Sequence, residues 1–332
     1  MIDSGAAWAL SSWTFAIVGT RDCMTSSKAL LQVKGLGRHF GPRLAVADVN
    51  LHVTRGEVLG LLGLNGAGKT TTLRMICGTL APSQGSICID GVDLMEQPAR
   101  ARQSLGYLPE TPPLTQDTSV REFLRFAAML RRVPSSLQHD AVARVLSRCG
   151  LADVAGRLIW HLSKGYPQRV GIAQAIVHEP ALVVLDEPTV GLDPRQVVDI
   201  RRLIDALRQD HAVIFSSHIL PEVQALCDRV VILHHGRQVY IGEPTDDDTE
   251  LRYQLRLQNP PDPGALQALA GVESVRQLEP MLFELVLADD AAALDEILAA
   301  AVAAGWQPRE LGRCRRTLEQ VFLSLTAGEA AA

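Results

Sequence analysis

A glycine-rich segment at residues 63–70 has the residue types and the spacing that bind phosphate groups. An apolar run precedes it and an apolar stripe with helical spacing follows it, so the segment joins a buried strand to a helix. Glycines let successive backbone N–H groups turn toward an anion, and the start of a helix adds partial positive charge. We expect Lys69 to reach the terminal phosphates and the Thr70 hydroxyl to ligate Mg²⁺. The segment predicts a nucleoside triphosphate site at Gly63, Asn65, Gly66, Ala67, Gly68, Lys69, Thr70 and Thr71, although the Thr71 side chain is expected to face the helix packing.

Two carboxylates, Asp186 and Glu187, end a second apolar run at residues 181–185. Buried carboxylates need a charged partner, and beside a triphosphate site that partner is Mg²⁺. We expect Asp186 to hold the metal and Glu187 to take a proton from an attacking water. The alternative interpretation is an acidic pair that caps a helix. His218 ends a third apolar run, and we expect it at the same site because strand ends in open α/β sheets bind ligands, whereas a lone histidine is more often structural.

Other residues carry weaker signals. Phe40 is either a core residue or the aromatic face on which an adenine ring stacks, and the spacing does not decide between the two. Ser163 and Asp193 each precede a helical pattern, so both are predicted to cap helices. The histidine pair at 234–235 is interpreted as a polar hairpin turn.

The remaining pattern alternates strands and helices. Alternating apolar residues predict antiparallel strands at 30–36 and 45–53. A helical block of roughly forty residues follows residue 113, with separate apolar stripes around Val120 and Val142. Other strands are expected at 58–62, 85–89, 105–108, 181–185, 213–218, 230–233 and 239–241.

Length and charge limit the class of protein. The chain has 332 residues, enough for two domains. Its formal net charge of −5 argues against nucleic acid as a partner recognised through a broadly basic surface. The six cysteines show no metal-ligand spacing. No run has the apolar length of a transmembrane helix. We expect residues 1–27 to be an N-terminal extension, either disordered or upstream of the true start, with an interfacial anchor as the alternative.

The motifs and their order resemble the ATP-binding cassette (ABC) ATPases over residues 30 to about 244. Nearly every motif of that family occurs here in the family's order, which is more specific than the phosphate-binding segment alone. The matches are Phe40 to the adenine-stacking aromatic, 63–70 to the Walker A loop, Glu110 to the Q-loop, 162–166 to the signature, Asp186 and Glu187 to Walker B, Asp193 to the D-loop and His218 to the switch histidine.

Two departures from the family pattern bear on the site. Lys164 and Tyr166 replace the usual glycine and glutamine of the signature, while Ser163 and Gly165 are retained. Glu110 replaces a neutral glutamine near the metal, and its added charge is expected to act on Mg²⁺. Both departures are similar to those of a branch that contains the single-cassette ATPases of multidrug and gliding-motility-associated exporters.

The resemblance implies a pair of cassettes, expected to be a homodimer, that closes head to tail over two ATP molecules. Ser163 and Gly165 of one subunit would face the γ-phosphate held by the other. It also implies a separate multi-span permease, an exporter and a peripheral position on the cytoplasmic face of the cell membrane. The alternatives are an importer ATPase, a soluble ABC ATPase that acts on ribosomes or nucleic acid, and a weakly catalytic regulatory subunit.

The tail after residue 244 is a separate unit by its pattern. It predicts strand 251–257, helix 264–270, strands 274–278 and 281–287, helix 289–304, strand 308–313 and a last helix around residues 318–325. The order of the first six is that of a ferredoxin-like domain. We therefore expect an α/β P-loop NTPase cassette at 28–244, with a mixed sheet core, an antiparallel β subdomain and a helical subdomain. A small α+β ferredoxin-like accessory domain at 245–332 follows it, with a regulatory or dimer-supporting role as a hypothesis.

Overall fold

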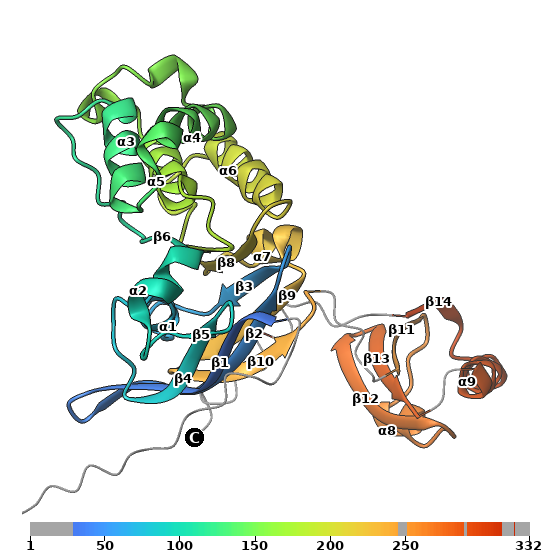
Figure 1. Ribbon diagram of the computed structural model, residues 1–332. Helices are drawn as coiled ribbons and strands as arrows, with labels where there is room; N and C mark the ends of the chain where they lie inside the picture. The colour runs from blue at the N-terminus through green and yellow to red at the C-terminus, as the bar shows by residue number, and fades with distance from the viewer. Residues whose placement is uncertain (1–28, 245–250, 289–290, 314–321, 323–332) are drawn as a thin grey trace, which may run out of the picture.

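The computed structural model describes residues 29–244, 251–288, 291–313 and 322 (Figure 1). The N-terminal extension and nearly all of the predicted last helix lie outside these residues. Within the described ranges, no helix is both long enough and apolar enough to cross a membrane.

A ten-stranded mixed sheet forms the centre of the cassette, in the order β5-β4-β1-β2-β10-β9-β3-β8-β7-β6. The predicted mixed and antiparallel parts are thus one continuous hydrogen-bonded sheet. Its strands are β1 (Ala29–Phe40), β2 (Arg43–Thr54), β3 (Val58–Leu62), β4 (Gln84–Ile89), β5 (Val92–Asp93), β6 (Leu105–Leu108), β7 (Leu182–Leu185), β8 (Ala212–Ser217), β9 (Arg229–His234) and β10 (Arg237–Gly242).

The strands β9, β3, β8, β7 and β6 pair in parallel. Every residue of β3, β7 and β8 is buried, as expected for parallel strands covered on both faces. Since parallel strands end at one edge, the residues that follow β3, β6, β7 and β8 gather there. That edge carries the phosphate-binding loop, Glu110, the acidic pair and His218.

Alternate residues of these strands belong to apolar clusters on opposite faces of the sheet. In β8, Val213 and Phe215 join the cluster that includes residues of the helical block, whereas Ala212 and Ile214 join the cluster that includes α1. The helices are α1 (Lys69–Ile76), α2 (Pro98–Ala101), α3 (Val120–Leu130), α4 (Ser135–Arg148), α5 (Tyr166–Ile176), α6 (Pro194–Leu207) and α7 (Leu220–Leu226), with 3₁₀ turns at Arg102–Ser104, Ala152–Val154 and Ile159–His161.

The helix caps follow the sequence in part. Asp193 caps α6 as predicted, and its side chain accepts hydrogen bonds from the backbone N–H groups of Arg195 and Gln196. The prediction that Ser163 caps a helix is wrong. The residue that caps α5 is Gly165, which has no side chain, and the Ser163 carbonyl instead accepts a turn hydrogen bond from Tyr166.

The C-terminal unit has a four-stranded antiparallel sheet in the order β12-β13-β11-β14. Leu255, Phe283 and Ile297 belong to its own apolar cluster. Phe322, the one described residue beyond 313, packs against the cassette cluster that includes the helical block. The elements are β11 (Leu251–Leu257), α8 (Pro263–Gln267), β12 (Val272–Glu279), β13 (Leu282–Leu287), α9 (Ala291–Ala303) and β14 (Pro308–Arg313).

Candidate nucleotide site

The glycine-rich segment is a loop between β3 and α1, as the sequence predicts. Gly66 and Gly68 have backbone φ angles of 83° and 103°, in the region that residues with a Cβ rarely occupy. Gly68 caps α1 without a side chain, and Lys69 is the first residue of the helix. The loop and the first turn of α1 therefore present backbone N–H groups to one space.

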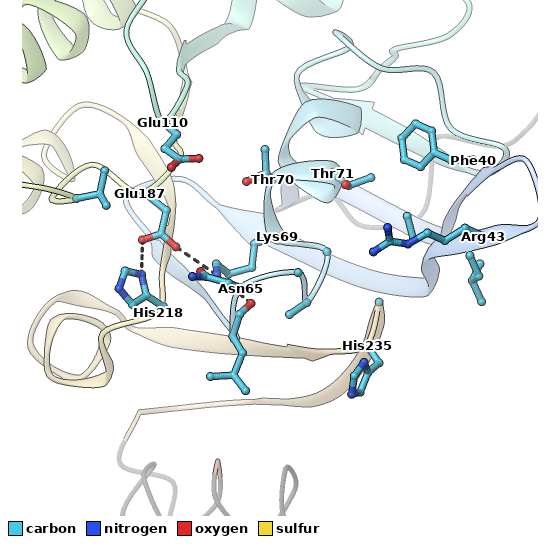
Figure 2. Close-up of a pocket in the computed structure, with 18 residues that line it drawn as sticks. Phe40, Arg43, Asn65, Lys69, Thr70, Thr71, Glu110, Glu187, His218 and His235 are labelled. Carbon is cyan, nitrogen blue, oxygen red and sulfur yellow. Dashed lines mark hydrogen bonds and ion pairs between the residues drawn. The ribbon is translucent and has the colours of Figure 1, made fainter. Parts of the chain in front are cut away.

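Lys69 bends back over this loop and is almost fully buried. Its Nζ donates a hydrogen bond to the Gly63 carbonyl at 2.7 Å and forms an ion pair with Glu187 Oε1 at 3.2 Å. Figure 2 shows the second contact as a dashed line across the pocket. Phosphate oxygens entering the loop would compete with Glu187 for the ammonium group.

Glu187 lies between two basic side chains. Its Oε2 is 2.9 Å from His218 Nδ1, while Oε1 faces Lys69 (Figure 2). Its backbone φ is 48°, an uncommon value for a residue with a side chain, and its N–H donates to Ser216 Oγ at 2.9 Å. Strained backbone of this kind concentrates at functional sites. The carboxylate is thus held at the end of β7 by contacts from β8 and α1.

Asp186 is fully buried behind Thr70. Its Oδ1 accepts hydrogen bonds from Ser216 Oγ at 2.7 Å and Thr70 Oγ1 at 3.2 Å. Burial is the largest cause that raises the pKa of this carboxyl group, and the charges of Glu110 and Glu187 raise it further. A buried carboxylate among like charges indicates a place for a cation.

The donor set fits Mg²⁺. Asp186 Oδ2 is buried and has no hydrogen-bond partner among the described residues, so it has a free lone pair. No three His, Cys, Asp or Glu side chains of the described chain form a metal cage by themselves. Mg²⁺ needs no such cage, since it usually takes one or two carboxylates together with substrate phosphates. Glu110, which was predicted to add a charge close to the metal, lines the cavity that also contains Lys69, Thr70 and Glu187.

The loop, Glu187 and His218 line one cavity of about 830 Å³, a volume that suits a nucleotide-sized ligand. Phe40 and Arg43 lie at one end of the pocket, and Glu110, Glu187 and His218 lie at the other (Figure 2). Of the predicted residues, the lining contains Phe40, Asn65, Gly66, Ala67, Gly68, Lys69, Thr70, Thr71, Glu110, Glu187 and His218.

The cavity also decides two open points. Phe40 is 46% exposed, so the core alternative is wrong for this residue. One face of its ring carries the Arg38 guanidinium at 4.8 Å, a cation–π contact. Thr71 lines the cavity, so the expectation that it faces the helix packing is wrong.

Five predicted residues lie outside this lining: Gly63 and Asp186, described above, and Ser163, Gly165 and Asp193. Gly165 packs against Gln196 so closely that an added Cβ would be 2.7 Å from the Gln196 Cδ. Gln196 in turn completes the cap formed by Asp193. Ser163 lies two residues before Gly165 in the sequence, and its side chain is exposed. The signature segment and the start of α6 thus form one small surface.

Among the lining residues that sequence reasoning missed are His235 and Gly236. The histidine pair was interpreted as a polar hairpin, and the turn between β9 and β10 is indeed there. However, the Gly236 N–H donates to the Ala67 carbonyl at 3.0 Å and its carbonyl accepts from Ala47 at 2.7 Å. These bonds bring the turn against the loop. A His-Gly turn has no phosphate-binding signature of its own, so the sequence carried no signal for it.

The strand, the glycine loop with Lys69 and Thr70, and the acidic strand end at one edge of a mixed sheet define a P-loop nucleoside triphosphatase. Comparisons with known proteins narrow this class. Residues 46–190 match the family model described as ABC transporter. The chain is 43% identical over 204 residues to the ABC transporter ATP-binding protein NatA of Bacillus subtilis (strain 168), covering 60% of this chain and 81% of NatA.

A second relative extends over more of the chain. The linearmycin resistance ATP-binding protein LnrL of Bacillus subtilis (strain 168) is 31% identical over 306 residues, covering 90% of this chain and 98% of LnrL. A solved structure, the dimeric post-hydrolysis state of the ATP-binding cassette MJ0796 bound to ADP and Pi, has a TM-score of 0.58. It is 22% identical, covers 64% of this chain and 98% of its own, and shows the shared fold.

This chain therefore belongs to the ATP-binding proteins of ABC transporters and is an ATPase.

Proposed function

We propose that this chain powers an ABC exporter by hydrolysing ATP, with Glu187 as the general base. The observation that supports the proposal is the position of the Glu187 carboxylate between Lys69 Nζ and His218 Nδ1. When a γ-phosphate enters the loop, Lys69 exchanges the carboxylate for phosphate oxygens. Oε1 is then free to accept a proton from water, while His218 holds Oε2 and contacts the γ-phosphate.

Thr70 and Asp186 would hold Mg²⁺, with Glu110 close by. The ion would neutralise charge that develops on the transferring phosphoryl group. Phe40 would stack on the adenine ring at the other end of the cavity, and Asn65, Thr71 and the loop amides would contact the phosphates. Asp186 is buried away from water, and a buried carboxylate needs a charged partner. The bound cation would be that partner.

We propose further that two copies of the chain form the working unit. Neither Ser163 nor Gly165 lines the cavity of its own chain, and Ser163 is exposed, so we propose that the segment carrying both residues contacts the ATP bound by a second copy. Asp193 lies beside them through Gln196 and would take part in the same contact. The MJ0796 structure is described as dimeric.

The permease is proposed to be a separate multi-span protein, with this chain bound at the cytoplasmic face of the cell membrane. The likeness to LnrL, a linearmycin resistance ATP-binding protein whose alignment covers 90% of this chain, supports export. We place the cassette at 28–244 and an accessory domain at 245–332. The strand order β12-β13-β11-β14 and the connections through α8 and α9 support a ferredoxin-like fold for the accessory domain.

The catalytic proposal is tested with Glu187→Gln, which keeps the size of the side chain and removes its basicity. We expect ATP to bind with wild-type affinity while turnover falls by about 10² to 10⁴-fold. Glu96→Gln, an exposed glutamate outside the cavity, is the matched control and keeps full turnover. Wild-type turnover in Glu187→Gln would remove the residue from the role.

The transporter proposal is tested by purifying the tagged chain from membranes in mild detergent and assaying its ATPase activity. A stoichiometric multi-span partner that changes turnover supports the proposal, and the identity of that partner separates export from import. Co-purification with ribosomes or nucleic acid, and with no membrane protein, would contradict it.

A further inference from the structure

A buried carboxyl group lies next to the catalytic residues and has no part in the chemistry described above. It belongs to Glu222, in the first turn of α7, and is only 1% exposed. Its Oε2 accepts two hydrogen bonds, from Thr189 Oγ1 at 2.8 Å and from Ser217 Oγ at 2.9 Å. Both donors are themselves buried. A buried oxygen that accepts two short hydrogen bonds from buried hydroxyl groups is a fixed point in the structure.

The first donor belongs to the turn that carries Glu187. Thr189 is two residues beyond Glu187, and the Val190 N–H donates to the Glu187 carbonyl at 3.1 Å to close this turn. Glu187 itself has the positive φ described above, so its backbone is held in place by its neighbours. The Thr189 hydroxyl is one of the groups that attach this turn to the rest of the cassette.

The second donor belongs to the turn that carries His218. Ser217 Oγ accepts a hydrogen bond from the Ile219 N–H at 2.9 Å, which spans His218, and donates to Glu222. One carboxylate oxygen therefore links the turn after β7 to the turn after β8. These are the two segments whose side chains meet in the Glu187–His218 contact of 2.9 Å.

A third contact comes from α6. Glu222 Oε1 faces the Arg201 guanidinium at 3.5 Å, an ion pair between α7 and α6. The carboxyl group is thus also held by α6, the helix that Asp193 caps.

We propose that Glu222 is a positioning residue for ATP hydrolysis, which sets the distance between Glu187 and His218 by holding their two turns with one oxygen. This inference rests on the proposed roles of Glu187 and His218. Loss of the link would let the two turns separate. Turnover would then fall while ATP binding is kept, because Glu222 does not line the nucleotide cavity. A displacement of about 1 Å at a catalytic group lowers rates by up to about a hundredfold.

The test uses Thr189, because truncating Glu222 would leave two buried hydroxyl groups unpaired and could unfold the chain. Thr189→Val keeps the shape of the side chain and removes the hydroxyl. Thr189→Ser keeps the hydroxyl and removes the methyl group. We expect Thr189→Val to lower kcat at least tenfold with KM for ATP within about twofold of wild type, and Thr189→Ser to keep kcat within about threefold.

A matched control is a threonine–glutamate hydrogen bond that lies away from the catalytic residues. Thr54 Oγ1 donates to Glu57 Oε2 at 2.8 Å, the same kind of bond, between the end of β2 and the start of β3 and outside the cavity. Thr54→Val removes that bond and is expected to leave kcat and KM unchanged. The inference is overturned if Thr189→Val keeps the wild-type kcat, or if Thr189→Val and Thr189→Ser lower kcat equally. It is also overturned if Thr189→Val raises KM for ATP and leaves kcat unchanged.

Glu187→Gln, measured in the same assay, separates this inference from the proposed function. If Glu187→Gln keeps wild-type turnover, the proposed function fails and the positioning role fails with it. If Glu187→Gln loses turnover and Thr189→Val does not, only the positioning role fails.

Discussion

Gly106, in the middle of β6, lies under α5, the helix that follows the signature segment. A Cβ at this position would be 2.2 Å from the Ala175 carbonyl oxygen and 3.0 Å from Pro180 Cγ. Carbon and oxygen atoms prefer separations above about 3.3 Å, so Gly106→Ala must move α5 and β6 apart by about 1 Å. The obstacle is a backbone atom within a helix, which cannot rotate away as a flexible side chain would.

The size of the effect follows from two opposing terms. Overpacking a core by one carbon costs about 1–3 kcal/mol, and a rigid neighbour places this case toward the upper end. Alanine reduces the conformational entropy of the unfolded chain, which raises the free energy of unfolding by about 0.4–1 kcal/mol. We expect Gly106→Ala to lower the free energy of unfolding by about 2 kcal/mol and Tm by about 4–8 °C.

The assay is urea unfolding followed by circular dichroism, with Gly156→Ala as the matched control. A Cβ at Gly156 would have no heavy atom within 4 Å, and its backbone φ is not positive, so this variant should be as stable as wild type. The reasoning is refuted if Gly106→Ala unfolds at the same urea concentration as Gly156→Ala.

Two further predictions concern the pocket and pH. Phe40→Ala should raise the Kd for ATP about 5- to 150-fold in calorimetric titration, since stacking of a base contributes about 1–3 kcal/mol, while Phe40→Trp keeps the wild-type value. Unchanged binding by Phe40→Ala would remove the stacking role. Burial lowers the pKa of His178 to about 4, so the unfolded chain takes up a proton first as the pH falls. His178 therefore contributes roughly 3 kcal/mol to the free energy of unfolding. This contribution is fully present above pH 6.5 and is lost as the pH falls toward 4. Denaturation at pH 7 and pH 4.5 should show a smaller loss for His178→Gln than for wild type, and equal losses would contradict the prediction.

Much of the site could be predicted from the sequence because its residues follow apolar runs. Lys69, Asp186 and His218 each follow a strand that is buried along its whole length. The parallel arrangement brings those strand ends to one edge whatever the order of the strands. Residue type and position along a run were therefore enough to place these side chains together.

Residues that depend on sheet order could not be predicted in this way. His235 reaches the pocket because β10 lies beside β2, and no local pattern records which strands are neighbours. Glu222 was missed for a related reason, since its two partners lie on segments that meet only in the folded chain. The Ser163 cap was predicted from residue preference alone, whereas the observed turn uses backbone atoms and leaves the hydroxyl out.

The helical block shows the limit of apolar stripes. The two stripes around Val120 and Val142 were correctly separated, and the structure divides them into α3 and α4. Arg132, between the two helices, has a φ of 60°, which ends helical geometry. Arginine is not a residue type that signals the end of a helix, so the two separate stripes predicted a break between the helices but not the residue at which it occurs.

The junction between β2 and β10, here called the seam, affects how firmly the two parts of the sheet are joined. The ladder there registers a single residue pair, Ala47 with Arg237, so the sheet is weakly joined at this point. Phe40 belongs to the strands on one side of the seam, and the glycine loop follows β3 on the other. A nucleotide held at both ends would connect the two parts of the sheet, and its binding energy would oppose their separation. Amide hydrogen exchange at Ala47, whose N–H donates to the Gly236 carbonyl across the seam, would then report whether the nucleotide is bound.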